Sequence, residues 1–256
     1  MNNMLDAREI ASLLPDGLAG IDIRVFQTID STNNYAKRLI LDGAAPGTAI
    51  LAESQTAGRG RRGRSFYSPA GSGLYISVIL RPKIDAVDDI QLLTAAAAVA
   101  VCRAIDRLKP DSGAQIKWVN DIFIGGKKVC GILSEAVSAG YRIAGTVVGI
   151  GVNCTTDAFP PELRDIACSL GGDISRNALA AGIISELLPL SENLRSPELI
   201  AEYRRRSYTL GRRIAFERGG RTVFATADSI NDNGNLVVRE PDGTLTVLFS
   251  GEATLA

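Results

Sequence analysis

The stretch of residues 115–153 restricts the fold more than any other part of the sequence. It holds the strand-like segments "QIKWVN", "DIFI", "KVCGILSEAV" and "YRIAGTVVGIGVN", and the short turns "GGK" and "SAG" separate the last three. Short glycine-containing turns of this kind join neighbouring antiparallel strands. The stretch therefore predicts consecutive β-hairpins, and we expect the chain to fold around a largely antiparallel sheet.

Helices are expected before and after this stretch. Residues 31–43 begin with Ser-Thr, carry apolar residues at helical spacing and end with Gly, which predicts a capped helix. Residues 86–110 predict a long, mostly buried helix that stops before the proline at its end. Two more helices and two more strands are expected, at residues 177–194 and 197–208 and at residues 48–54 and 73–80.

The C-terminal part of the chain has a different character. From Gly211 onward, short strand-like segments alternate with the turns "DNGN" and "PDG". This pattern predicts a small β-barrel of about 45 residues, which is too small to stand alone and should pack on the larger part. The sequence thus predicts an α+β fold in two domains. Residues 1–209 would form a mixed, largely antiparallel sheet flanked by helices, and residues 210–256 the small β-barrel.

Composition excludes several classes of protein. The 28 basic and 28 acidic residues cancel, which argues against a surface that coats nucleic acid. The longest apolar run, residues 95–102, is too short to cross a membrane, and the N-terminus does not resemble a secretory signal. Four scattered cysteines indicate buried thiols in a cytoplasmic protein. The sequence has no histidine, so a Ser-His-Asp triad or a Cys-His pair is excluded, and chemistry by positioning and charge neutralisation fits better.

Positive charge is most concentrated at residues 58–64, "GRGRRGR". The letters match a dinucleotide-binding fingerprint, but that motif must open a helix, and the turn-forming "SFYSPAGSG" follows here. An RNA-binding Gly/Arg segment usually repeats within a disordered tail, and a solvated loop does not explain seven positions restricted to Gly and Arg. Anion binding is favoured, because glycines expose backbone N–H groups and guanidinium groups grip carboxylate or phosphate.

Three further segments carry polar or glycine residues that suit a binding site. In "KWVNDIFIGGKKVCGILSE", Lys117 and Lys128 can bind phosphate and Asp121 can hold magnesium, although turn chemistry and solvated lysines also explain much of the pattern. "GIGVN" at residues 149–153 places glycines where another backbone or a flat ligand could approach, and a structural role is equally compatible. "STN" at the start of the predicted helix is by itself most simply a helix cap.

Together and in this order, these segments resemble the motifs of biotin–protein ligases. That family combines Ser-Thr-Asn at a helix start, Gln-x-x-Gly-Arg-Gly-Arg-x-Gly-Arg with Ser-Pro shortly after, Lys-Trp-Pro-Asn-Asp, Lys-x-x-Gly-Ile-Leu-x-Glu and Gly-x-Gly-x-Asn. This chain has "STN", "QTAGRGRRGR" with "SP", "KWVND", "KVCGILSE" and "GIGVN". The resemblance covers about residues 25–155 and extends to the small β domain. It implies a class II synthetase-like catalytic domain and an SH3-like C-terminal barrel.

The resemblance also implies a role for each matching residue. Biotin would be bound by Ser31, Thr32, Asn33, Gln55, Gly58, Arg59, Gly60, Arg61, Lys128 and Gly131. The nucleotide would be bound by Arg61, Arg64, Phe66, Lys117, Asn120 and Asn153. Arg59, Lys117 and Lys128 would be the catalytic cations, and Asp121 would lie near the phosphates and Mg²⁺. Val119 replaces the family's proline, which loosens a turn, and Phe66 replaces the family's tryptophan, which keeps an aromatic face but loses an indole donor. Neither change indicates an inactive enzyme.

The reaction implied by the resemblance has two steps, with biotin and ATP as substrates and Mg²⁺ as the metal. Biotin's carboxylate attacks the α-phosphorus of ATP and gives biotinoyl-5′-AMP and pyrophosphate. A lysine of the biotin carboxyl carrier protein of acetyl-CoA carboxylase, or of a related carboxylase, then displaces AMP. The Gly/Arg segment is expected to be mobile when empty and to close over the adenylate.

Other functions remain open from the sequence. A lipoate or octanoate ligase would share the fold and the adenylation chemistry, but its substrate lacks the ureido group that Ser31, Thr32 and Gln55 would bind. A Gly/Arg-loop RNA-binding module would need no ATP. Family members that repress transcription carry a DNA-binding domain before "STN", and only 30 residues precede Ser31, so no DNA binding is expected. A homodimer is compatible with the family.

Overall fold

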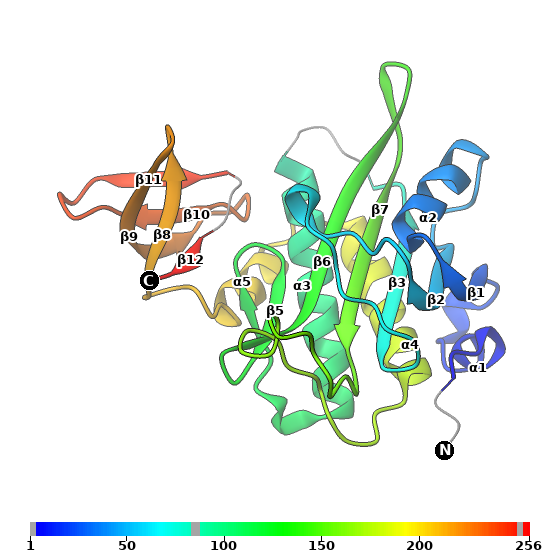
Figure 1. The fold of residues 1–256 in the computed structure, drawn as a ribbon. Helices are drawn as coiled ribbons and strands as arrows, with labels where there is room; N and C mark the ends of the chain where they lie inside the picture. The colour runs from blue at the N-terminus through cyan, green and yellow to red at the C-terminus, as the bar shows by residue number, and fades with distance from the viewer. Residues whose placement is uncertain (1–3, 83–87, 250–252) are drawn as a thin grey trace.

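A computed structural model describes residues 4–82, 88–249 and 253–256 of the chain. Within these residues the chain forms two β-sheets (Figure 1). A seven-stranded sheet carries helices on its faces, and a five-stranded antiparallel sheet lies beside it at the C-terminal end. The α+β fold class predicted from the sequence is confirmed.

The large sheet has the strand order β1-β2-β3-β7-β6-β5-β4. Among the described strands, β1 and β2 run parallel, and the other neighbouring pairs are antiparallel. The predicted hairpins are confirmed, because β4, β5, β6 and β7 follow one another both in the chain and in the sheet. The strands are β1 (Ile23–Ile29), β2 (Ala49–Gln55), β3 (Gly73–Leu80), β4 (Gln115–Lys117), β5 (Asp121–Ile124), β6 (Lys127–Ala139) and β7 (Arg142–Asn153).

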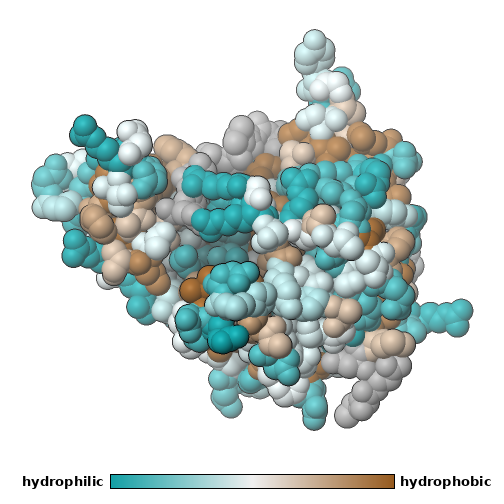
Figure 2. Space-filling model, in the orientation of Figure 1, coloured by the Kyte–Doolittle hydropathy of each residue, from teal (hydrophilic) through white to brown (hydrophobic). Residues whose placement is uncertain are grey.

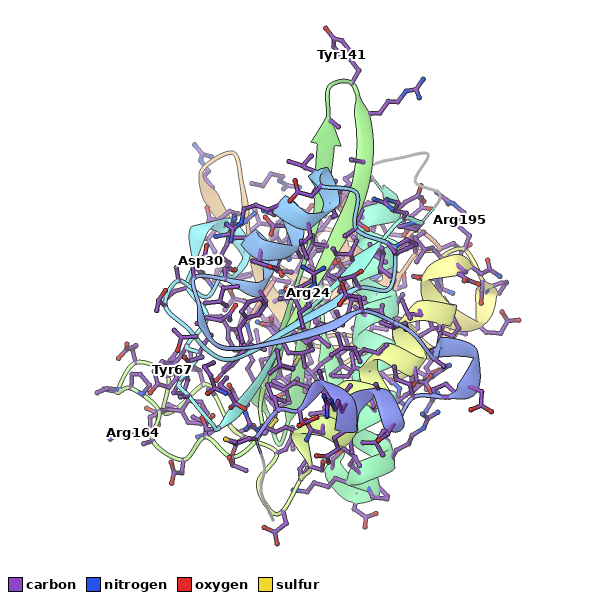
Figure 3. The ribbon with its side chains drawn as sticks, turned by 90° about the vertical axis from the view of Figure 1, so that its right-hand side faces the viewer. Arg24, Asp30, Tyr67, Tyr141, Arg164 and Arg195 are labelled. Atoms are coloured by element: carbon purple, nitrogen blue, oxygen red, sulfur yellow. The ribbon has the colours of Figure 1, made fainter. Side chains whose placement is uncertain are left out.

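The turn between β5 and β6 depends on two glycines. Gly125 and Gly126 have φ angles of 56° and 82°, in the region that residues with a side chain rarely adopt. Two consecutive positive φ angles match the twist of a tight hairpin, which explains the "GG" in the sequence. Past the sheet, β6 and β7 continue as a projecting hairpin with Tyr141 at its tip (Figure 3).

Helices cover both faces of the large sheet. α3 and α4 pack on each other and against one face, and α2 packs against the other. Alternation along each strand supplies both faces with apolar side chains: Leu51 of β2 belongs to the core beneath α3 and α4, and Ile50 to the cluster beneath α2. The helices are α1 (Ala7–Ser12), α2 (Thr32–Leu41), α3 (Asp88–Leu108), α4 (Arg176–Glu192) and α5 (Pro197–Arg205), with short 3-10 turns at Asp16–Leu18, Arg61–Gly63 and Pro110–Ser112.

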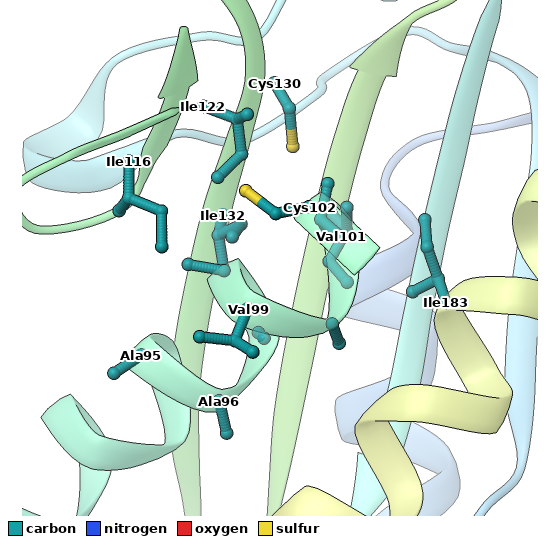
Figure 4. Close-up of a cluster of buried hydrophobic side chains, with 14 of the residues drawn as sticks. Ala95, Ala96, Val99, Val101, Cys102, Ile116, Ile122, Cys130, Ile132 and Ile183 are labelled. Carbon is teal, nitrogen blue, oxygen red and sulfur yellow. The ribbon is translucent and has the colours of Figure 1, made fainter. Parts of the chain in front are cut away.

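α3 runs through the centre of the core. Its alanine-rich surface lets the helix lie close to β6, where Val99 and Cys102 are near Ile132 and Cys130 (Figure 4). Burial raises the pKa of the Cys102 thiol to about 12 and that of Cys130 well above its usual value, so both thiols stay protonated. All four cysteines are free; Cys102, Cys130 and Cys154 are buried, as the sequence predicted, and Cys168 is partly exposed. Residues 86 and 87 of the predicted helix lie outside the described residues.

The end of α5 and the start of α4 both differ from the prediction, the first because of a distant segment and the second because of a local cap. α5 ends at Arg205 instead of continuing to residue 208. The backbone there turns to pair with β4, because Ile116 donates its N–H to Arg206 O (2.8 Å) and accepts one from Tyr208 (2.8 Å). α4 begins one residue early, at Arg176, because the Ser175 hydroxyl accepts the N–H of Ala178. These hydrogen bonds stabilise ends that periodicity alone does not predict.

The C-terminal sheet has the order β11-β10-β9-β8-β12 and contacts the rest of the chain at the end of β9 and in the loop that follows it. The Gly234 carbonyl accepts hydrogen bonds from the Trp118 indole (3.0 Å) and from the Gln91 amide (2.6 Å). Arg204 of α5 donates to the Ile230 carbonyl (2.6 Å). The strands are β8 (Arg213–Arg218), β9 (Arg221–Ile230), β10 (Leu236–Arg239), β11 (Leu245–Leu248) and β12 (Thr254–Leu255). No helix in the described part of the chain has the length and apolarity needed to cross a membrane.

Candidate active site

A pocket of about 120 Å³ lies between α2, β6 and the segment that carries the clustered arginines. We call this segment, residues 58–66, the arginine loop. Figure 2 shows hydrophilic residues gathered on this face of the molecule, in front of the large sheet. The pocket brings together most of the residues predicted from the sequence: Ser31, Thr32, Asn33, Gln55, Arg59, Gly60, Arg61, Arg64, Phe66, Asn120, Asp121, Lys128 and Gly131.

The floor of the pocket follows from the alternation of side chains along β6 and β7. Ile132 and Ile150 belong to the core, so the odd-numbered neighbours Gly131 and Gly151 face the pocket, and the strand register pairs these two glycines. A Cβ atom on Gly151 would lie 2.5 Å from the ring of Phe66. The flat group that approaches these glycines is therefore the Phe66 ring of the arginine loop.

One end of the pocket is lined by hydrogen-bonding groups where α2 begins. Gln55 Oε1 accepts hydrogen bonds from the N–H of Thr32 (2.9 Å) and from its hydroxyl (3.2 Å), and Gln55 Nε2 donates to Ser68 Oγ (3.0 Å). Ser31 occupies the N-cap position, but its side chain makes no capping hydrogen bond. The interpretation of Ser31 as a side-chain cap is therefore wrong. Gln55 caps the helix from a neighbouring strand, and the Ser31 hydroxyl lines the pocket.

Asn33 lines the same end, and its amide is held by the protein. Nδ2 donates to Glu135 Oε2 (2.9 Å) and to Leu133 O (3.3 Å), and Oδ1 accepts from the Ser77 hydroxyl (2.6 Å). Gly149 makes room for this side chain, because a Cβ there would lie 2.0 Å from Asn33 Oδ1. The structure thus gives Asn33 a supporting role, and its predicted contact with biotin stays a prediction.

The arginine loop is a tight hairpin that closes on itself. Phe66 donates its N–H to Gly58 O (2.9 Å), and Gly60 donates to Arg64 O (2.7 Å). A side chain on Gly58 would collide with Phe66 O, which would lie only 2.5 Å from its Cβ. Arg62 at the tip has a φ of 55°, a conformation that costs free energy in a residue with a side chain. The glycines of the motif therefore serve the shape of the loop itself.

Two arginines attach this loop to opposite walls of the pocket. Arg61 donates to Asn120 Oδ1 (3.1 Å), in the turn between β4 and β5. Arg59 donates to Asn34 Oδ1 (2.9 Å) on α2, and its guanidinium lies 3.3 Å from Glu135 Oε1 on β6. The structure therefore describes the loop in a closed conformation, and the predicted mobility of the empty loop stays a prediction.

Lys128 supplies a further positive charge at the pocket. Its ammonium group lies 2.7 Å from Asp121 Oδ1, and its stem lies over Gly131, where a Cβ would be 3.1 Å from Lys128 Cε. Asp121 Oδ1 is buried and has no hydrogen-bond partner among the described residues, so the contact is an ion pair without hydrogen-bond geometry. Within the described residues, no group of three or more Cys, Asp or Glu side chains could hold a metal ion.

Three predicted residues do not line the pocket. Gly58 lies in the base of the arginine loop, where it packs against Phe66 and Ser68. The Lys117 ammonium lies 5.5 Å from the centre of the Phe123 ring on the hairpin of β4 and β5. Asn153, at the end of β7, donates to Cys168 O (3.1 Å). Their predicted contacts with biotin or nucleotide stay predictions.

The sequence reasoning assigned no role to Ser68, Ser77 or Glu135, which hold other pocket residues in place. Ser68 accepts from Gln55, and Ser77 donates to Asn33. Glu135 ends the "KVCGILSE" motif, and strand alternation puts it on the same face as Gly131. That alternation could have predicted the position of Glu135 from the sequence, whereas the contacts of the two serines depend on the packing of segments that are distant in the chain.

Two regions of the chain match protein families. Residues 25–153 match the biotin/lipoate A/B protein ligase family. Residues 209–255 match the biotin protein ligase C-terminal domain.

Curated relatives match over nearly the whole chain. The chain is 36% identical to the bifunctional ligase/repressor BirA of Bacillus spizizenii, over 98% of this chain and 79% of that protein. It is 32% identical to the biotin–[acetyl-CoA-carboxylase] ligase of Mycobacterium tuberculosis, over 97% of this chain and 94% of that protein.

The fold is also similar to solved structures. The biotin protein ligase from Aquifex aeolicus in complex with biotin and ATP superimposes with a TM-score of 0.76 at 26% identity, over 92% of this chain and 98% of that one.

Proposed function

The chain belongs to the biotin/lipoate A/B protein ligase family, and from this premise we propose how its pocket performs the reaction. The protein is a biotin ligase that activates biotin with ATP and transfers it to a biotin carrier protein of a carboxylase. One observation supports the assignment of individual residues. A single pocket has hydrogen-bonding groups at one end, from Ser31, Thr32 and Gln55, and cations at the other, from Arg61 and Lys128.

The hydrogen-bonding end suits the ureido ring of biotin. That ring carries a carbonyl oxygen and two N–H groups, and it needs donors and acceptors in a buried setting. The Ser31 hydroxyl can do both, and it is nearly fully buried. The Gln55 amide is oriented by Thr32 and Ser68, which fixes which of its ends meets the ligand. Lipoate and octanoate carry no such polar ring, so this end favours biotin.

The cationic end suits the first chemical step. Biotin's carboxylate must approach the α-phosphate of ATP, and two unit charges 3.5 Å apart repel by about 5 kcal/mol at an effective dielectric constant of about 20. Uncompensated, that repulsion would slow the reaction by more than about a thousandfold. Arg59, Arg61 and Lys128 offset it. The carboxylate oxygen bonds to the α-phosphorus and pyrophosphate leaves, with no need for a histidine base.

The second step needs the adenylate to be held and kept from water. A lysine amine of the carrier attacks the acyl carbon of the mixed anhydride and AMP leaves. Phe66, packed against Gly151, covers the pocket floor from the arginine loop. A closed loop over the anhydride protects it from hydrolysis until the carrier lysine enters. We also propose that Arg64, Asn120, Asn153 and Lys117 bind the nucleotide, as the similarity of their motifs to those of the family implies.

Asp121 fits a role in holding Mg²⁺. Magnesium is usually bound by one or two carboxylates together with substrate phosphates. Asp121 Oδ1 is a buried oxygen without a hydrogen-bond partner among the described residues, next to the Lys128 ammonium. The metal, when bound, would neutralise negative charge on the phosphates, while Lys128 orients the carboxylate of Asp121.

The domain boundaries, the cellular location, the oligomeric state and the absence of DNA binding are further proposals. We propose that residues 1–209 form the catalytic domain and residues 210–256 a second domain. A cytoplasmic location, a homodimeric state and the absence of DNA binding also stay predictions. Light scattering of the purified chain would test the dimer, and a gel-shift assay with duplex DNA would test DNA binding.

Pyrophosphate exchange into ATP tests the proposed function. The assay is run with Mg²⁺ and with biotin, lipoate, octanoate or no acid in parallel. We expect exchange with biotin alone, because the buried polar groups at Ser31 and Gln55 lose their partners when the acid lacks a ureido ring. Exchange with lipoate or octanoate instead would overturn the assignment of the polar end. No exchange with any acid would overturn the adenylation chemistry.

A further inference from the structure

Glu135 is a half-buried carboxylate on β6, four residues beyond the pocket floor at Gly131. Its Oε2 accepts from Asn33 Nδ2 (2.9 Å) and its Oε1 from the Lys37 ammonium (2.6 Å). Burial raises the pKa of Glu135, and the hydrogen bonds from Lys37 and Asn33 outweigh burial and bring the pKa below its usual value. The carboxylate is therefore ionised at neutral pH.

The body of the protein holds this carboxylate firmly in position. Asn33 gives both hydrogens of its amide to β6, one to Glu135 and one to Leu133 O, and Ser77 fixes the amide's orientation from the other side. Lys37 belongs to α2, which packs on the sheet. Of the partners described for Glu135, Arg59 alone comes from the arginine loop.

Arg59 is clamped between this carboxylate and α2. Its Nη2 lies 3.3 Å from Glu135 Oε1, and its Nη1 donates to Asn34 Oδ1 (2.9 Å), whose own amide is oriented by Asp30 (3.0 Å). A guanidinium has five N–H donors, so these two contacts leave donors for an anion in the pocket. The contact between Arg61 and Asn120 attaches the other side of the loop.

We propose that Glu135 is a positioning residue: by pairing with Arg59 it holds the arginine loop closed and so retains the adenylate. The inference rests on the proposed function for its substrate. In the alternative, Glu135 would compete with the anionic ligand for the Arg59 guanidinium, and Arg59 would have to leave Glu135 before it could bind the ligand. The two alternatives predict opposite effects of removing the Glu135 charge. If Glu135 positions Arg59, the closed loop would loosen; if Glu135 competes with the ligand, ligand binding would tighten.

The test compares Glu135→Gln with the wild-type chain. Gln keeps the size of the side chain and removes the charge that pairs with Arg59. We expect biotinoyl-adenylate to leave the variant about two- to fivefold faster, as for the loss of a partly exposed ion pair. The KM for biotin should rise by about the same factor while kcat of pyrophosphate exchange changes by less than about twofold. Release is followed by a chase of preformed, radiolabelled adenylate complex.

Two further variants separate positioning from general structural damage. Lys37→Met removes the other cation at Glu135 without touching the loop, and release should be no faster than in the wild type. Glu135→Gln placed in an Arg59→Ala background should add nothing to the effect of Arg59→Ala, because both remove the same contact. The melting temperatures of all variants are compared first.

A ligand-free measurement keeps this inference distinct from the proposed function. Trypsin should cut the empty loop at Arg61, Arg62 or Arg64 about two- to fivefold faster in Glu135→Gln than in the wild type, if opening of the loop limits cleavage. Slower release, unchanged cleavage, or an equal effect of Glu135→Gln in both backgrounds would overturn the positioning role. A wild-type chain that forms no adenylate would overturn the proposed function, and the cleavage rates would still decide the role of Glu135.

Discussion

Replacement of Gly149 by alanine should destabilise the fold from within the pocket floor. A Cβ atom at this position would lie 2.0 Å from Asn33 Oδ1 and 2.7 Å from its Cγ. Asn33 cannot easily move away, because its amide makes hydrogen bonds of 2.6, 2.9 and 3.3 Å to Ser77, Glu135 and Leu133. Ser77 is fully buried and Asn33 nearly so, which leaves little water to replace a broken hydrogen bond.

The size of the effect follows from these contacts. Displacing the Asn33 amide breaks at least one buried hydrogen bond, and an unsatisfied buried polar group costs about 1–3 kcal/mol. With the steric shift added, we expect Gly149→Ala to lower the free energy of unfolding by about 3 kcal/mol. For a chain of this size, that corresponds to a melting temperature about 6–12 °C lower. Thermal unfolding followed by circular dichroism, together with urea titration, measures both quantities.

Two glycines on the same strand provide controls. At Gly145 an added Cβ would meet Ile40 and Leu80 at 3.3 Å, so Gly145→Ala should cost less than about 1 kcal/mol. At Gly151 the collision is with Phe66, which belongs to the arginine loop and can move with it. Gly151→Ala should therefore leave the melting temperature nearly unchanged and speed loss of the adenylate. A Gly149→Ala chain that melts within 2 °C of the wild type would refute the account of Asn33.

Three other substitutions test separate parts of the structure. Arg61→Gly removes the contact with Asn120, so biotinoyl-adenylate should still form but escape about tenfold faster in a chase experiment; equal retention would contradict its holding role. Gln55→Leu should raise the KM for biotin about tenfold or more in pyrophosphate exchange without creating lipoate activity; an unchanged KM would contradict the assignment of the ureido end. Arg176→Met leaves the buried Glu53 carboxylate without its ion-pair partner and should lower the free energy of unfolding, measured by urea titration, by about 3–5 kcal/mol. As a control, Arg24→Met removes one partner of an exposed ion pair and should lower it by less than about 1 kcal/mol.

Local patterns in the sequence predicted much of the fold. Strand alternation and the glycine turns predicted the hairpins of β4 to β7, because both depend only on residues close together in the chain. Helix periodicity placed α2 to α5 within a few residues of their observed ends. Two of the errors come from contacts between segments that are distant in the chain. α5 stops early because Tyr208 pairs with Ile116, and Ser31 does not cap α2 because Gln55 does.

The sequence by itself determined the chemistry that the pocket can hold: the arginines, Lys128, the polar residues at the start of α2, and the glycines that give β6 and β7 a flat face. Tertiary structure decided which of them meet. Strand register puts Gly131 opposite Gly151, and packing brings Glu135 to Lys37, 98 residues away, and to Arg59. Side-chain type and periodicity are local properties, whereas register and helix packing depend on the whole core. The role of Glu135 therefore becomes visible only once the sheet, α2 and the arginine loop are assembled.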